Sequence, residues 1–158
     1  MKTLRKFISR GLEALAGTSF LIMVALTCWQ VFTRYVLGRP STWSEEMVSY
    51  LFAWASLLGA SLVTAGRGHM NIPIVVEHMK PAARKAFAIL GEATAFLFSA
   101  VILGYGGVKI AALAMGQATS SLGVPVGVFY TVLPLTGGLN MLYTILNIAD
   151  ICKQEKGA

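Results

Sequence analysis

One carboxylate, Glu92, lies well inside a long apolar stretch of the sequence. A charge inside a membrane is costly, so such a residue belongs to a transport or ion site, or a neighbouring group neutralises it. Transport sites gather several polar groups near the middle of the membrane. Here the other polar residues of the apolar stretches are scattered: Gln30, Asn140 and Asn147. We therefore predict that Glu92 is structural, bound to a cation or hydroxyl of a neighbouring helix or protonated at a subunit seam, with a transport site as the alternative.

The two histidines, His69 and His78, both fall in one polar segment between apolar stretches. A haem in a helix bundle needs axial ligands that project inward from the helices. A zinc site needs three or four convergent ligands. The sequence has no Gly-rich phosphate loop, no G-x-S-x-G and no CxxC. We therefore expect no cofactor, no metal site and no enzymatic activity.

Small side chains recur at helical spacing in two of the apolar stretches. Ser56 and Ala60 form one stripe, and Gly91, Ala95 and Ser99 form another. Small residues let helix backbones approach closely in a membrane, whereas bulky apolar side chains face lipid. We predict that both stripes make close helix contacts, within this chain or against another subunit. The opposite face of the helix that carries Ser56 is predicted to face lipid: Met47, Leu51, Trp54, Leu58 and Leu62.

Charged residues gather around a short Gly/Pro-containing turn. Thr42 and Glu45 have the S/T-x-x-E spacing of a capping box, which begins a helix. Glu45 and Glu46 also follow closely on Arg34 and Arg39. We predict an ion-pair and capping cluster that holds the first two helices together. The alternative is a set of ordinary solvated charges, because exposed ion pairs contribute little.

Four apolar stretches must position these residues. Hydrophobic residues make up 56% of the 158 residues and charged residues only 13%, against about 25% in soluble domains. A helix of about 20 apolar residues crosses a bilayer. We predict an all-α integral membrane protein, with residues 1–158 forming a single membrane domain and Pro134 kinking the last helix. The predicted transmembrane helices cover about residues 12–36, 43–65, 83–115 and 125–152.

The basic residues are distributed unequally between the two predicted sides of the membrane. One side receives three, which are Arg34, Arg39 and Lys109. The other receives ten: Lys2, Arg5, Lys6, Arg10, Arg67, Lys80, Arg84, Lys85, Lys153 and Lys156. Because loops rich in Lys and Arg stay in the cytoplasm, both termini are predicted to be cytoplasmic. The net charge of +6 is therefore a topology signal, and we expect no nucleic-acid partner.

Nearly the whole chain resembles a known family. The likeness is carried by QVFTRYVLGR (30–39), WSEEMVSYLFAWASLLGASLV (43–63), RGHMNI (67–72) and SLGVPVGVFYTVLPLTGGLNML (121–142). Together these segments resemble the small permease subunit, of DctQ type, of tripartite ATP-independent periplasmic (TRAP) transporters.

The resemblance implies a sodium-driven transporter in the bacterial inner membrane. Its partners would be a large permease subunit, which carries the substrate and sodium sites, and a periplasmic binding protein that delivers an organic acid. The small subunit would be a membrane scaffold, and Arg34 and Arg39 would help to dock the binding protein. Alternatively, Arg34 anchors its helix in headgroups or pairs with Glu45 or Glu46. Which organic acid is carried, and the stoichiometry of the complex, are not encoded in this subunit.

Two other classes of protein remain as alternatives from the sequence. A small multidrug exporter is also a short four-helix chain, but its working glutamate lies in the first helix, where this chain has only Glu13 among arginines. The membrane-anchor subunit of a redox complex is disfavoured, because no histidine lies in a predicted helix.

Overall fold

The computed structural model describes residues 2–66 and 81–153, and the regular elements there are helices. The helices are α1 (Lys2–Tyr35), α2 (Thr42–Ala65), α4 (Pro81–Phe98), the π-helix η2 (Ser99–Gly106), α5 (Gly107–Ala114), α6 (Val126–Tyr130) and α7 (Val132–Lys153). An isolated β-bridge joins Ala118 and Pro125 between α5 and α6.

Four helical stretches are long and apolar enough to cross a membrane, which confirms the predicted all-α class. They cover Arg5–Tyr35, Thr42–Ala65, Ala83–Ala114 and Val126–Cys152. The first helix begins at Lys2 and not at about residue 12, because nothing between residues 2 and 10 interrupts it. Its polar first turns extend beyond the apolar part, which was the only part that hydropathy could detect.

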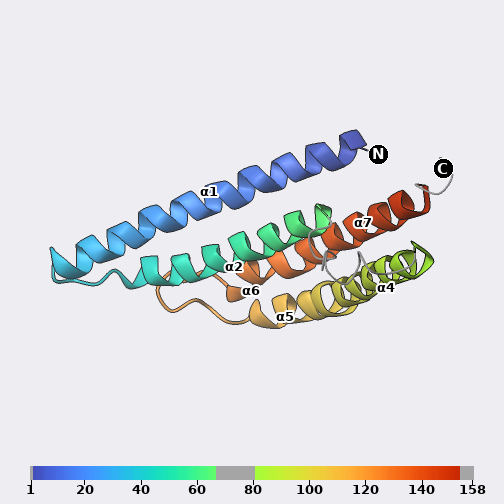
Figure 1. The fold of residues 1–158 in the computed structure, drawn as a ribbon. Helices are drawn as coiled ribbons and strands as arrows, with labels where there is room; N and C mark the ends of the chain where they lie inside the picture. Colours follow the sequence, from blue (N-terminus) through green and yellow to red (C-terminus); the bar gives the residue numbers. More distant parts are fainter. Residues whose placement is uncertain (1, 67–80, 154–158) are drawn as a thin grey trace.

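The helices form a row and not a bundle around one central core (Figure 1). α1 packs along α2, and α2 packs on α7, which in turn contacts α4, η2 and α5. The buried core includes Leu12, Leu58 and Tyr143, so it follows the line where α1, α2 and α7 meet. Within residues 5–35 of α1, only Leu12 and Thr33 are buried. One flank of α1 is therefore open along its whole length.

The inward face of α2 is the opposite of the predicted one. Leu58 is 1% exposed, and Trp54 and Leu62 pack against the core around it. Ser56 and Ala60 are exposed in this chain, so their predicted close contact stays a prediction for another subunit. Both sides of α2 are equally compatible with an apolar solvent, so burial followed the fit against α1 and α7 and not side-chain size.

Glycines bring α7 and α6 close to the third span. A Cβ on Gly137 would lie 2.8 Å from the backbone nitrogen of Gly104 in η2, and one on Gly107 would lie 2.8 Å from Cβ of Leu133. Gly127 of α6 approaches the carbonyl of Ala111 in the same way. Close helix packing therefore depends on three glycines that were not part of the predicted stripes.

The last span is interrupted at Thr131, between α6 and α7. A kink was expected at Pro134 in a helix interior. Pro134 occupies the third position of α7, so the interruption lies about one turn before the proline. The break falls before the proline because Pro134 cannot donate to the carbonyl of Tyr130, and the Thr131 hydroxyl donates to the carbonyl of Val128 at 2.6 Å.

Candidate functional site

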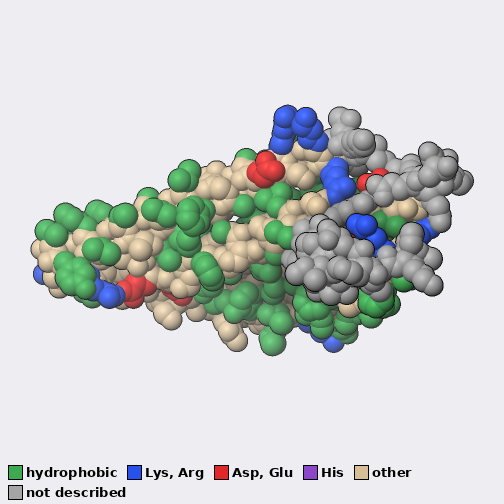
Figure 2. Space-filling view, viewed as in Figure 1, with side chains coloured by type: hydrophobic (Ala, Val, Ile, Leu, Met, Phe, Trp, Pro, Cys, Tyr) green, Lys and Arg blue, Asp and Glu red, His purple; other side chains and the backbone are tan. Residues whose placement is uncertain are grey.

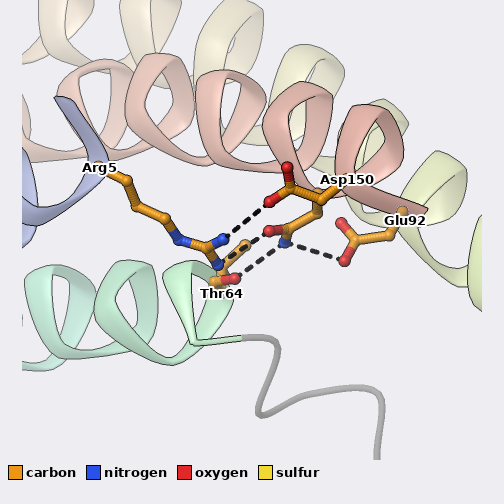
Figure 3. Close-up of polar contacts among 5 residues, drawn as sticks. Arg5, Thr64, Glu92 and Asp150 are labelled. Carbon is orange, nitrogen blue, oxygen red and sulfur yellow. Dashed lines mark hydrogen bonds and ion pairs between the residues drawn. The ribbon is translucent and has the colours of Figure 1, made fainter. Parts of the chain in front are cut away.

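Asn147 is hydrogen-bonded to Arg5, Thr64 and Glu92 in a polar network near one end of the helices, where Arg5, Thr64, Glu92 and Asp150 are labelled in Figure 3. Its side-chain nitrogen donates to Oε1 of Glu92 at 2.9 Å and to the backbone carbonyl of Thr64 at 3.1 Å. Its side-chain oxygen accepts a hydrogen bond from Arg5 at 3.0 Å. Arg5 also contacts Asp150, with an N–O distance of 3.5 Å. We call these five residues the Asn147 network.

The Asn147 network joins all four spans. Arg5 comes from α1, Thr64 from α2, Glu92 from α4, and Asn147 and Asp150 from α7. An amide can donate two hydrogen bonds and accept others through one rigid group, so it can connect a cation, a carbonyl and a carboxylate at once. Asn147 is fully buried and Glu92 is 3% exposed. The hydrogen bond between Asn147 and Glu92 therefore forms away from water, where it fixes the positions of the helices most effectively.

The structure brings together residues that the sequence analysis had left apart. Asn147 was described as one of several scattered polar residues, but it forms a direct hydrogen bond with Glu92. Arg5, in the polar start of α1, was not predicted to bind either residue. A weak signal existed, since Glu92 and Asn147 each lie a few turns from the basic end of their helix. That signal gives depth along a helix but not the side of the helix that faces a neighbour.

A second polar cluster lies at the opposite end of the helices, around the start of α2. Arg34 forms an ion pair with Glu45, and both side chains are partly exposed. Glu46 accepts hydrogen bonds from the backbone nitrogens of Ser120 at 3.2 Å and Ser121 at 2.9 Å. The two glutamates therefore have separate tasks. Glu45 links α2 to α1, and Glu46 holds the segment between α5 and α6.

The expected capping box at Thr42 does not form. The N-cap of α2 is Ser41, its side chain makes no capping hydrogen bond, and Thr42 is the first helical residue. The carboxylate of Glu45 points to Arg34 and not back to the start of its own helix. The guanidinium of Arg34 brings an opposite charge to this carboxylate, which the start of α2 would supply only through backbone N–H groups. Ser44 completes the turn by donating to the carbonyl of Ser41 at 2.8 Å.

Aromatic contacts continue this second cluster toward the middle of α2. The rings of Tyr50 and Phe129 stack with their centroids 3.9 Å apart. The indole nitrogen of Trp54 donates to the backbone carbonyl of Phe129 at 2.9 Å. α6 therefore lies beside the first half of α2 and runs in the same direction.

The two polar clusters are separated by about one membrane thickness. Glu46 and Thr64 are 18 residues apart on α2, which corresponds to about 27 Å along a helix. The hydrocarbon core of a bilayer is about 30 Å thick. On the face drawn in Figure 2, charged side chains gather toward the two ends and hydrophobic ones lie between them. The clusters therefore fit the two interfaces of a bilayer.

The remaining candidate residues have different surroundings. Gly91 and Ala95 of α4 are half-buried, and Ser99 at the start of η2 is buried. Arg39 is exposed, in the turn before α2. His69 and His78 lie outside the described residues.

Comparison with known proteins identifies the family. Residues 23–154 match the family of tripartite ATP-independent periplasmic transporters, DctQ component. The chain is 25% identical over 159 residues to the sialic acid TRAP transporter small permease protein SiaQ of Vibrio cholerae, covering 95% of this chain and 92% of that protein. It is 22% identical over 125 residues to a putative TRAP transporter small permease protein of Haemophilus influenzae, covering 79% and 75%.

A third relative places the same type of segment in a longer chain. The sialic acid TRAP transporter permease protein SiaT of Haemophilus influenzae is 31% identical over 80 residues, which cover 51% of this chain but 13% of that protein. With four apolar spans, two polar clusters one membrane thickness apart and a family match over most of its length, the chain belongs to the DctQ family of TRAP transporter small permease subunits, and it is part of a transporter and not an enzyme.

Proposed function

We propose that this chain is the static scaffold of a sodium-driven organic-acid transporter in the bacterial inner membrane. In this proposal the large permease subunit binds substrate and sodium and moves, and a periplasmic binding protein delivers the substrate. The Asn147 network is the observation that carries the scaffold role. It ties all four spans together at one buried point, so the helices are held as one unit and not hinged.

The relatives support the class of substrate and the main partner. Some relatives are named for sialic acid and others for C4-dicarboxylates, and these compounds share a carboxylate. In SiaT, the segment similar to this chain is part of a longer permease polypeptide. A permanent association between the small and large subunits is therefore the simplest arrangement. Because the chain belongs to this family, the alternatives of a self-sufficient exporter and a redox membrane anchor are no longer needed.

The proposed orientation puts both termini, and with them the Asn147 network, on the cytoplasmic side. The excess of Lys and Arg near that end supports it. A reporter enzyme that is active only in the periplasm, fused after residue 158, should be inactive, and the same reporter inserted after Arg39 should be active. The reverse pattern would overturn the orientation without affecting the family assignment.

Docking of the binding protein is proposed to involve Arg39 more than Arg34. Arg34 already forms an ion pair with Glu45, which supports the alternative that Arg34 pairs within this chain. Arg39 is exposed in the connecting turn, where a partner carboxylate can reach it. Such a charge steers association more than it adds affinity. An Arg39→Glu complex should take up substrate poorly at low concentrations of binding protein and low salt, and uptake equal to the wild type under those conditions would overturn the docking role.

The scaffold proposal as a whole is tested by reconstitution in liposomes. The purified small subunit alone should show no sodium-driven uptake of any organic acid. The complex with its large subunit and binding protein should show sodium-driven uptake of an organic acid. Uptake by the small subunit alone would overturn the proposal.

A further inference from the structure

Lys109 on α5 lies deep along the third span, and its depth can be read from the neighbouring helices. Gly127 approaches Ala111, and Gly107 approaches Leu133, so α5 runs antiparallel to α6 and the start of α7 in a defined register. Lys109 lies midway between residues 107 and 111. It is therefore level with about residue 130, at the end of α6.

The residues of α2 at the same depth as Lys109 lie near the middle of that helix. Phe129 stacks on Tyr50 and accepts a hydrogen bond from Trp54, so the end of α6 is level with residues 50–54. Residues 50–54 are four to eight residues beyond Glu46, which corresponds to about 6–12 Å along the helix. Lys109 therefore lies inside the apolar zone between the two polar clusters.

The side chain of Lys109 also points away from the nearer end of that zone. Its ammonium lies 4.5 Å from the ring centroid of Tyr105, which is one turn farther from the Glu46 end. Lys109 is exposed, and the neighbours Tyr105 and Leu113 are 63% and 78% exposed. Among the described residues, no carboxylate pairs with Lys109. An aromatic face offsets only part of the cost of a cation in hydrocarbon.

The segment after α5 marks how far the third span reaches. Residues 115–125 continue without a helix after Ala114, and Ser120 and Ser121 donate backbone hydrogen bonds to Glu46, at the polar end of α2. Lys109 lies five residues before the end of α5, on the side away from this polar end.

We propose that the large permease subunit covers the face of η2 and α5 formed by Ile102, Tyr105, Lys109 and Leu113, and that one of its membrane helices supplies a carboxylate that pairs with Lys109. We call this surface the Lys109 face. The inference rests on the proposed scaffold function, which supplies a partner inside the membrane. The periplasmic binding protein cannot reach this depth, and the Lys109 side chain points away from the nearer lipid headgroups.

The first test is co-purification of the large subunit with tagged variants of this chain. Lys109→Glu should reduce the recovered large subunit by about tenfold or more, because it leaves two carboxylates facing each other without a cation. Lys109→Gln should give an intermediate loss, and Lys109→Arg should assemble like the wild type. Lys6→Glu is the matched control, since it makes the same charge change at an exposed position on α1. Recovery with Lys109→Glu equal to that of the control would overturn the proposal.

The second test does not depend on the folding of a charge variant. A photo-crosslinking phenylalanine analogue at Tyr105 should join this chain to the large subunit on illumination of the assembled complex. The same analogue at Phe20, on the open flank of α1, reports the background. Crosslinks from position 105 to a second copy of this chain, or to lipid alone, would overturn the proposal. If the wild-type chain does not co-purify with the large subunit at all, the scaffold function itself fails; if it does and the Lys109 variants also do, only the Lys109 face is wrong.

Discussion

Asn147 donates a hydrogen bond of 2.9 Å to Glu92, although 55 residues separate them in the sequence. Both side chains are buried, and Asn147 also binds Arg5 and the carbonyl of Thr64. The carboxylate that first suggested a transport site is therefore part of a junction between helices.

Asn147→Leu should destabilise the protein. It leaves Glu92 and Arg5 without their shared amide, and an unsatisfied buried polar group costs about 1–3 kcal/mol. Thermal unfolding of the purified complex in detergent measures the change. Thr94→Val is the control, because the Thr94 hydroxyl is exposed and bonds only to its own helix. A melting temperature equal to that of the wild type would show that the network does not stabilise the fold.

Glu92→Gln should keep both assembly and transport. A glutamine oxygen can still accept the hydrogen bond from Asn147, so the junction survives without the charge. Sodium-dependent uptake by the reconstituted complex is the measurement, with Glu92→Leu as the variant that loses the acceptor and should be less stable. Loss of sodium dependence in an intact Glu92→Gln complex would instead make Glu92 a site residue.

Gly137→Ala and Gly138→Ala should have opposite effects on stability. A Cβ on Gly137 would lie 2.8 Å from the backbone of Gly104, whereas one on Gly138 meets no atom within 4 Å. Overpacking costs about 1–3 kcal/mol, while alanine in a helix is favoured over glycine by about 0.5–1 kcal/mol. Thermal unfolding of the two variants side by side tests the close approach of α7 to η2. Equal melting temperatures would contradict it.

Glu46→Ala should lower stability more than Glu45→Ala. Glu46 receives two backbone N–H groups from residues 120–121, while Glu45 belongs to a partly exposed ion pair with Arg34. Exposed ion pairs contribute only about 0–1 kcal/mol. Limited proteolysis between α5 and α6 gives a local readout, and it should accelerate in Glu46→Ala alone. Faster cleavage in Glu45→Ala as well would show that both glutamates hold this segment.

Several properties of this protein follow from the sequence by itself. Hydropathy and length predicted four spans, because crossing a bilayer requires about 20 apolar residues in a row and that requirement is local. The closeness in sequence of Arg34 and Glu45 also indicated their ion pair, since a short turn brings the two helix ends together. The motifs around residues 30–72 and 121–142 were sufficient to indicate the family, which the comparison confirmed.

The tertiary structure decided which faces meet. In a soluble protein the buried face of a helix is the apolar one, but lipid is as apolar as a protein core, so hydropathy does not distinguish Leu58, which is buried, from Phe52, which is 62% exposed. The hydrogen bond between Asn147 and Glu92 depends on how α7 fits against α4, and the depth of Lys109 depends on how α5 packs against α6. Such contacts join residues far apart in the chain, and the local pattern of one sequence records the position of each residue along its helix but not its partner across the interface.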